Sequence, residues 1–232
     1  MKSRKNLLEQ LKSLPHFGKN TVYQLGLQLG LKDSTVDTYI SRFLKCKEIY
    51  RLKNGLYLSA DFFDKNRNDI SYSFYLANII RTPSYVSSWA ALQYYNLTTE
   101  AIHSVTSVTP KVTRDYQTKA GNFAYQSINK KLFSNFSLAN PVRSLAHVKG
   151  ASPKDLVEAT SNGVKGKFDF FIASPSKALF DLLYFRTRQF RGVPLEKIKV
   201  LVEELRIDIN EMDEKEQVKF YTMIKKYSHE FR

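Results

Sequence analysis

The fold of this chain is decided by residues 33–58, which read DSTVDTYISRFLKCKEIYRLKNGLYL. The first half has the period of an amphipathic helix, with apolar side chains at steps of three and four residues. The second half holds two short apolar runs, residues 49–52 and 56–58, around Lys53-Asn54-Gly55. Asn-Gly between such runs is typical of a β-hairpin, because both residues accept positive φ angles. The stretch therefore predicts a helix followed by a tight hairpin with a basic tip.

The predicted helix, which starts at Asp33 or Ser34, has two different faces. Its apolar side chains gather on one face, which must point into a core: Val36, Tyr39, Ile40, Phe43 and Leu44. Small hydroxyls and cations occupy the opposite face: Ser34, Thr38, Ser41, Arg42 and Lys45, with Thr35 at its edge. The segment Ser34-Thr35-Val36-Asp37 is similar to a capping box, with Asp37 in the place usually held by Glu or Gln.

The polar face suits a helix that lies in the major groove of DNA. Hydroxyls can donate or accept hydrogen bonds at base edges, and Arg42 can bind guanine O6 and N7 in a bidentate fashion. An ordinary solvated face is the alternative when this helix is taken alone. The hairpin favours DNA, because its tip, Lys53 and Asn54, would reach backbone phosphate or the neighbouring minor groove.

Two further helical patterns precede this stretch. Leucines recur at helical spacing in residues 4–14, before Pro15, and residues 20–29 have one apolar side. Gly30 then suits the left-handed position just after a helix. Two helices with a tight Gly turn and a hairpin are typical of a winged helix-turn-helix, so residues 1–62 are predicted to form a DNA-binding domain. Protein contact alone is the less common use of such a fold.

The charge of the chain fits a polyanionic partner. The formal net charge is +14, distributed as +7 on residues 1–68, +8 on residues 69–191 and −1 on residues 192–232. Neutralisation of phosphates by Lys and Arg releases counterions and drives non-specific binding to nucleic acid. No apolar run is long enough to cross a membrane, and the single Cys46 excludes an intramolecular disulfide framework. These features predict a cytoplasmic location.

A second domain is predicted to follow a linker. Residues 61–68 are polar and typical of turns, so the boundary is expected there, with a mixed α/β domain over residues 69–232 and a helical end from about residue 192. Helices are expected at residues 69–80, 88–95 with Ser87 as cap, 175–185 with Ser174 as cap, 195–205 and 214–227. Strands are expected at residues 104–109, 113–117, 123–128 and 168–172, with Gly121-Asn122 as a turn. The fold class is therefore α+β.

Three stretches of the chain resemble the abortive-infection antitoxin family called AbiEi: YRLKNGLY (residues 50–57), PSYVSSWAAL (residues 83–92) and IASPSKALFDLL (residues 172–183). Their order spans about residues 20–190. The family commonly has Gly after the Tyr-Tyr pair, where this chain has Asn96. The resemblance implies the antitoxin and autorepressor of a bacterial toxin–antitoxin operon linked to phage defence. It implies a winged helix that binds inverted repeats in the promoter, and a C-terminal domain that counteracts a nucleotidyltransferase-like toxin.

Known catalytic motifs are missing from the sequence. It contains neither the Gly-Ser and Asp-x-Asp pattern of a nucleotidyltransferase nor a phosphate-binding or zinc-protease motif. We therefore expect no enzyme activity, cofactor or metal, although a site assembled from distant residues would escape this test. Cys46 is expected to be a small core-facing thiol. Lys177 and Asp181 are expected to form an ordinary helical ion pair worth a few tenths of a kcal/mol.

Two other functions stay open at this point. One is a winged-helix transcription factor whose second domain binds a small effector, which an apolar pocket with convergent polar groups would favour. The other is an enzyme with an accessory winged helix, which a cleft of clustered acids with shifted pKa values would favour.

Overall fold

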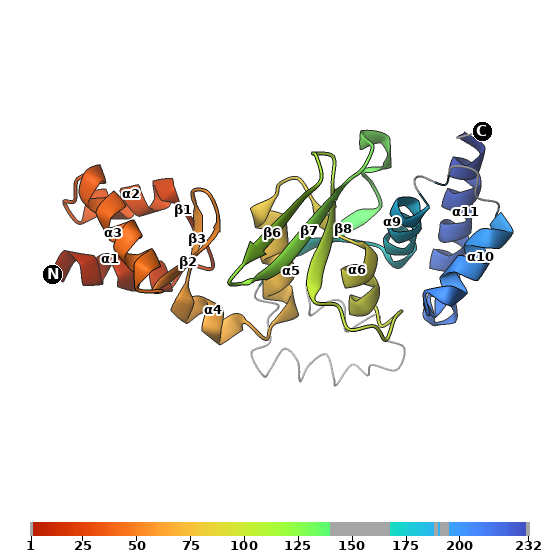
Figure 1. Cartoon of the computed structure of the whole chain (residues 1–232), viewed down its shortest axis with the longest axis horizontal. Coiled ribbons are helices and arrows are strands. Elements are labelled where there is room, and N and C mark those ends of the chain that lie inside the picture. Colours follow the sequence, from red (N-terminus) through yellow and green to blue (C-terminus); the bar gives the residue numbers. More distant parts are fainter. Residues whose placement is uncertain (1, 140–167, 188–189, 191–194, 231–232) are drawn as a thin grey trace. The chain divides into compact units, whose positions relative to one another are not determined.

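The computed structural model describes residues 2–139, 168–187, 190 and 195–230, and it has the expected α+β class (Figure 1). The chain forms two compact units. The first comprises Met1–Ser73 with Tyr116–Asn122, and the second comprises Phe74–Asp115 with Phe123–Arg232. None of the described helices is long and apolar enough to span a lipid bilayer.

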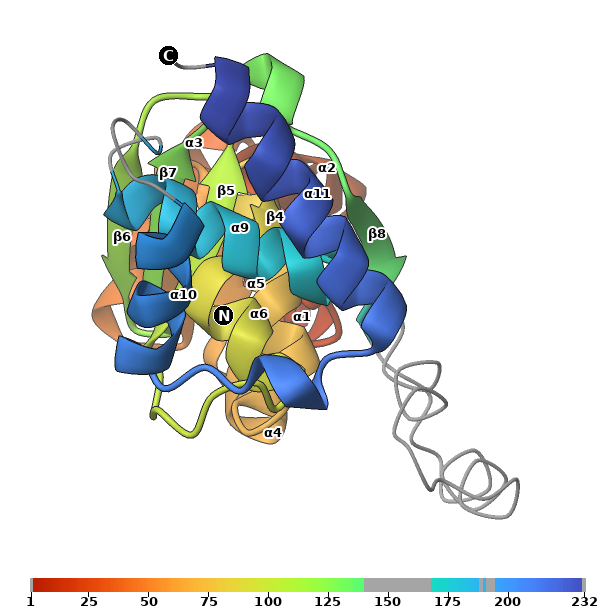
Figure 2. The same ribbon diagram turned by 90° about the vertical axis from the view of Figure 1, so that its right-hand side faces the viewer.

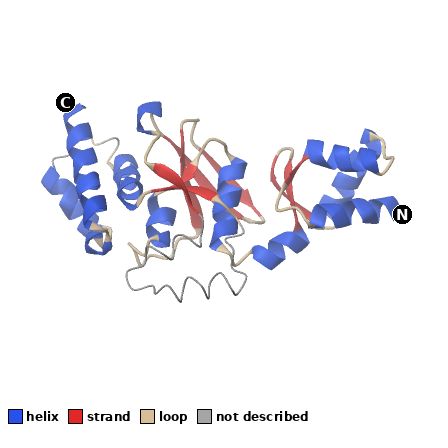
Figure 3. Ribbon diagram, turned by 180° about the vertical axis from the view of Figure 1, so that it is seen from behind, coloured by secondary structure: helices blue, strands red, loops and turns tan. Residues whose placement is uncertain are grey.

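The first unit has the order of elements of a winged helix. The order is α1 (Lys2–Lys12), β1 (Phe17–Gly18), α2 (Lys19–Gln28), α3 (Asp33–Lys45), β2 (Ile49–Lys53), β3 (Leu56–Ser59) and α4 (Ala60–Asn66). The strands form an antiparallel sheet in the order β1-β3-β2, beside α1, α2 and α3 (Figure 3). The sequence predicted the helices and the hairpin but missed the two-residue β1, which is too short for a period to be visible.

Left-handed residues end both helices of the helix-turn-helix. Gly30 has the predicted positive φ of 71°, and the Leu31 amide donates to Gly26 O at 2.9 Å, which is a Schellman motif. Helix α3 ends in the same way: Lys47 has a φ of 57°, and the Glu48 amide donates to Phe43 O at 2.9 Å. These motifs satisfy the last carbonyls of α2 and α3 and set the paths into the turn and the wing.

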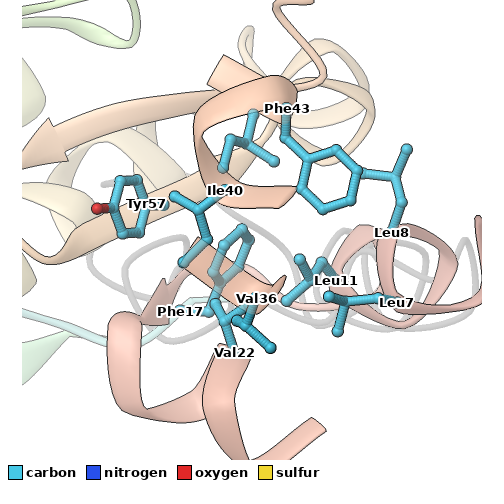
Figure 4. Packing of buried hydrophobic residues seen from close by; sticks show 10 residues of the cluster. Leu7, Leu8, Leu11, Phe17, Val22, Val36, Ile40, Phe43 and Tyr57 are labelled. Carbon is cyan, nitrogen blue, oxygen red and sulfur yellow. The ribbon is translucent and has the colours of Figure 1, made fainter. Parts of the chain in front are cut away.

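One apolar core holds the helices and the hairpin of the first unit together (Figure 4). Its side chains come from α1, β1, α2, α3, β2 and β3: Leu7, Leu8, Leu11, Phe17, Val22, Val36, Ile40, Phe43, Ile49 and Tyr57. Full burial of a side chain of this size stabilises the fold by about 1.5–3 kcal/mol relative to exposure. The predicted inward face of α3 thus anchors the helix, which leaves its other face to solvent.

The segment predicted to be a linker is mostly helical. Helix α4 begins at Ala60, and the Ser59 hydroxyl caps it by accepting a hydrogen bond from the Phe62 amide at 3.4 Å. Phe62 and Phe63 also have aromatic neighbours, Tyr72 and Tyr50. The expectation of turns was wrong because the Phe pair supplies tertiary packing that polar composition does not reveal.

The second sheet has six strands in the order β6-β7-β5-β4-β9-β8. Their bounds are β4 (Tyr85–Val86), β5 (Ser104–Thr109), β6 (Arg114–Thr118), β7 (Gly121–Ser127), β8 (Phe136–Ala139) and β9 (Phe170–Ala173). Strands β4 and β9 are parallel, with Val86 opposite Ile172. Gly121-Asn122 lies inside β7, not in a turn, and β4 and β8 were not predicted. The two strands have only two and four residues, too few for an alternating pattern to be visible.

The remaining helices are α5 (Ile70–Ile80), α6 (Ser88–Tyr94), α9 (Pro175–Arg186), α10 (Leu195–Glu204) and α11 (Glu214–Glu230), with short 3-10 turns at Lys130–Leu132 and Ile209–Glu211. Ser174 caps α9 as predicted, accepting a hydrogen bond from the Lys177 amide at 3.4 Å. Helix α11 lies along α9 (Figure 2). The Glu216 carboxylate of α11 accepts hydrogen bonds from the Ser176 amide at 3.1 Å and from its hydroxyl at 2.6 Å.

Candidate DNA-binding surface

The apolar face of α3 is buried and its polar face is exposed, as predicted. Val36, Ile40 and Phe43 are at most 4% exposed. The residues of the predicted DNA-binding face are exposed, with Thr35 half-buried: Ser34, Thr38, Ser41, Arg42 and Lys45. Within the described residues neither Arg42 nor Lys45 has an acidic partner. Both cations are therefore available to an external anion.

The hydroxyls of this face are already oriented by the helix. Thr38 Oγ1 donates to Ser34 O at 2.9 Å, and Ser41 Oγ donates to Asp37 O at 3.0 Å. Each hydroxyl hydrogen points along the helix, so the oxygen lone pairs face outward as acceptors. In this state Thr38 and Ser41 can accept from a cytosine or adenine amino group, while Arg42 and Lys45 can only donate.

Asp37 does not take part in a capping box. Lys32 is the N-cap residue of α3, and no described side chain caps this end. The Asp37 carboxylate instead pairs with Lys19 Nζ at 2.9 Å and accepts a hydrogen bond from Tyr23 Oη at 2.8 Å. The predicted box is wrong because Lys19 and Tyr23 of α2 compete for the same carboxylate. The three side chains form a clamp between the two helices.

The hydrogen bonds of this clamp shift the pKa values of Asp37 and Lys19. The pKa of Asp37 is lowered from its ordinary value, first by the hydrogen bond from Lys19 and then by the one from Tyr23. The pKa of Lys19 is raised, chiefly through Tyr23 and then through Asp37, and the ammonium lies 5.1 Å from the centre of the Tyr23 ring. The carboxylate and the ammonium therefore stay charged at neutral pH, and the clamp links α3 to α2 by a solvent-exposed contact, the side chains being 43% and 48% exposed.

Gly26 lets the two helices of the helix-turn-helix approach closely. A Cβ added at Gly26 would lie 2.4 Å from Val36 Cγ2, which is closer than real Cβ atoms come to a neighbour. Val36 is fully buried at the start of α3. The crossing of α2 over α3 thus depends on a glycine that local propensity alone would disfavour in a helix.

The wing is joined to the start of α2. Gly55 in its turn has a φ of 73°, whereas Asn54 is not at positive φ, so only one of the two turn residues uses this conformation. The Lys19 amide donates to Gly55 O at 3.0 Å. Asn54 is exposed at the tip, and Lys53 beside it is half-buried. The predicted wing-tip residues are therefore held at a set place relative to α2.

Cys46 lies on the surface. It is the C-cap residue of α3 and is exposed, so the expectation of a core-facing thiol was wrong. The inward face of α3 ends with Phe43 and the half-buried Leu44, and the left-handed Lys47 turns the chain before another core position arises.

Lys177 and Asp181 are not a surface pair. Their side chains are 1% and 0% exposed, and Lys177 Nζ lies 2.5 Å from Asp181 Oδ1. The other carboxylate oxygen accepts hydrogen bonds from Tyr85 Oη at 3.0 Å and from Ser87 Oγ at 2.7 Å. The expected value of a few tenths of a kcal/mol does not apply, because helix spacing reveals the pair but not its burial. Ser87, expected to cap α6, gives its hydroxyl to Asp181 instead.

This buried cluster joins two of the three stretches on which the family resemblance rests. Tyr85 and Ser87 belong to residues 83–92, and Lys177 and Asp181 belong to residues 172–183. The pKa of Asp181 is raised by desolvation, against the opposing effect of Lys177 and the two hydroxyls. Burial, followed by the charge of Asp181, raises the pKa of Tyr85. The four residues of the cluster are at most 1% exposed.

Several residues of the surface were missed from the sequence. The clamp residues Lys19, Tyr23 and Asp37 lie on two helices, so only the crossing of α2 and α3 brings them together. In the part of the chain that the structure describes, no three His, Cys, Asp or Glu side chains gather as metal ligands would. A search of protein family models and of curated proteins finds no match to this chain.

Proposed function

We propose that this chain is a transcriptional regulator that binds double-stranded promoter DNA, and that it serves as antitoxin and autorepressor of a bacterial toxin–antitoxin operon. The observation that carries DNA binding is the exposed face of α3 in a winged-helix order of elements. This face has outward hydroxyls and the cations Arg42 and Lys45, which pair with no acid among the described residues. The buried face of α3 and the Gly26 crossing support DNA binding, since recognition requires a helix held firmly on its scaffold.

In the proposed complex α3 lies in the major groove. Arg42 binds a guanine edge, the hydroxyls of Thr38 and Ser41 accept from neighbouring bases, and Lys45 neutralises a phosphate. Lys53 and Asn54 of the wing contact the adjacent backbone or minor groove. Two copies on inverted repeats would place two such helices on successive turns of the duplex.

The antitoxin role rests on the resemblance of the three stretches to the AbiEi family. It assigns residues 69–232 to counteracting a nucleotidyltransferase-like toxin in the cytoplasm, without enzyme activity of their own. The order of a winged helix followed by a mixed α/β unit is compatible with this division of labour. The buried Lys177–Asp181 cluster would then hold the second unit in shape rather than act on a substrate.

A gel-shift titration of the promoter, combined with a growth-rescue assay against the neighbouring toxin, tests both parts. The variant R42A/K45A/K53A should weaken promoter binding and leave rescue intact, because all three residues lie outside residues 69–232. The control K197A/K199A/K215A removes three exposed lysines of α10 and α11 and should leave DNA affinity close to wild type. Loss of rescue in the folded first variant would contradict the division into two functions.

Single variants separate base readout from phosphate contact. Arg42→Ala should cost about 1–3 kcal/mol on the operator and relax the preference for one base pair, whereas Lys45→Ala should weaken operator and unrelated DNA alike. If wild-type protein binds operator and unrelated duplex equally at every salt concentration, sequence-specific repression is refuted.

A further inference from the structure

A hollow of about 440 Å³ lies in the first unit, between the N-terminal turns of α1 and the C-terminal end of α3. Three cations, one acid and two apolar side chains line it: Lys2, Arg4, Lys5, Glu48, Leu8 and Phe43. None of these residues belongs to the DNA-binding face that the sequence predicted.

The floor and one wall of the hollow are formed by side chains that contact one another. Leu8 and Phe43 lie against each other in the core, at 8% and 0% exposure (Figure 4). The Arg4 guanidinium lies 5.2 Å from the centre of the Phe43 ring and pairs with Glu48 at 2.5 Å. Arg4 Nε is buried and has no hydrogen-bond partner among the described groups. The only acid of the hollow is thus already neutralised by a cation held in place.

The rim supplies two more cations. Lys2 and Lys5 are exposed, and neither has an ion-pair partner among the described residues. Their spacing of three residues on α1 puts both side chains on one side of the helix, with Cβ atoms about 5–6 Å apart. Because Phe43 and Leu8 are buried, the two ammonium groups are what the hollow presents to a ligand, and they suit an anionic one.

We propose that this hollow is a contact for the DNA backbone, with the exposed ammonium groups of Lys2 and Lys5 on neighbouring phosphates. The inference rests on the proposed function, because the DNA is the duplex held by α3. The hollow lies at the C-terminal end of α3, the end that also carries Arg42 and Lys45, so we place it along the backbone of the same duplex. The hollow extends the interface beyond the recognition helix and the wing.

The test measures affinity of the full chain for the promoter duplex and for an unrelated duplex over a range of salt concentrations. The variant K2Q/K5Q should weaken binding to both duplexes equally, on the order of ten-fold per lysine at 0.1 M salt. The slope of log affinity against log salt should become shallower by about 2, since two phosphate contacts are lost. The variant K2R/K5R keeps both charges and should keep the wild-type slope.

The control K197Q/K199Q removes the same charge from exposed positions of α10. If K2Q/K5Q has the slope and affinity of this control while wild-type protein binds the promoter, the inference is refuted and the proposed function stands. If wild-type protein binds neither duplex, the proposed function itself fails. A loss confined to the promoter duplex would also refute the inference, because a backbone contact carries no sequence information.

Discussion

Replacement of Asp181 by Asn is expected to destabilise the second unit severely. The change keeps the shape of the side chain but removes its charge, so the Lys177 ammonium stays 1% exposed without a counterion. The cation would keep a neutral amide oxygen and the faces of Phe180 and Tyr85, whose ring centres lie 4.9 and 6.0 Å away. Aromatic faces offset only part of the desolvation of an ammonium.

The magnitude follows from burial. Breaking a buried ion pair by removing one partner costs about 3–5 kcal/mol, whereas exposed pairs contribute about 0–1 kcal/mol. Asp181 is 0% exposed and also accepts from Tyr85 and Ser87, so the hydroxyls of both lose a charged acceptor. We therefore expect Asp181→Asn to cost at least 3 kcal/mol of the free energy of unfolding, a large part of the stability of an average domain.

The only tryptophan of the chain reports on this unit. Trp89 lies on α6, two residues after Ser87, so its fluorescence follows unfolding of the second unit in urea. The midpoint of the Trp89 transition should fall in Asp181→Asn, with little change in its slope. Lys177→Met should also be destabilising, but less so at low pH. Without Lys177 the already raised pKa of Asp181 rises further, so the folded variant gains relative stability as the pH falls and the carboxyl becomes neutral.

Lys219→Met is the matched control. Like Lys177, Lys219 pairs with an acid on its own helix: Glu216, three residues away, at 2.6 Å. The Lys219 side chain, however, is 64% exposed. This variant should cost no more than about 1 kcal/mol. A cost for Asp181→Asn as small as that of the control would refute the reasoning that burial makes the Lys177–Asp181 pair essential.

Three other perturbations test the fold. Gly26→Ala should destabilise the first unit by about 1–3 kcal/mol, because the added Cβ meets Val36 Cγ2 at 2.4 Å, and this outweighs the better helix propensity of Ala. Thermal unfolding followed by circular dichroism measures the change. A neutral or stabilising result would show that α2 and α3 can separate freely. Gly55→Ala should cost about 1–2 kcal/mol in the same assay, since a side chain at a φ of 73° is strained although the space is open; an unchanged melting temperature would argue against the left-handed turn. Glu216→Gln should make the loss of stability in acid less steep. Although desolvation raises the pKa of Glu216, hydrogen bonds from Lys219 and Ser176 lower it overall. The contribution of Glu216 to the free energy of unfolding is therefore present above about pH 4.5 and is lost as the pH falls through the lowered pKa. Equal acid sensitivity of the variant and wild type, measured by urea midpoints between pH 3 and 7, would exclude this role.

Local features of the sequence were enough to predict most helices and turns of the first unit. The spacing of apolar residues predicted α1, α2 and α3, Gly30 predicted the turn, and Asn54-Gly55 predicted the hairpin. These features depend on residues a few positions apart, and period and turn chemistry act at that range. The same reasoning located the cap at Ser174 and the start of α9.

Features that join distant residues could not be predicted in this way. Asp37 was assigned to a cap because the cap lies nearby in sequence, whereas its partners on α2 are 14 and 18 positions away. The polar composition of residues 61–68 indicated turns, but Phe62 and Phe63 pack as part of α4. Lys2, Arg4 and Lys5 lie close together in the sequence, yet only the fold places them beside Phe43.

The sequence by itself determined that the chain begins with three helices and a basic hairpin, and that one side of residues 33–45 is polar and cationic. Each of these depends on backbone preference and on the separation of apolar from polar side chains within one element. Tertiary structure alone decided that Lys177 and Asp181 are buried, that Cys46 is exposed, and that Asp37 clamps α3 to α2. The physical reason is that burial and the strength of an ion pair depend on which elements lie opposite a side chain, and that information is spread over the whole chain.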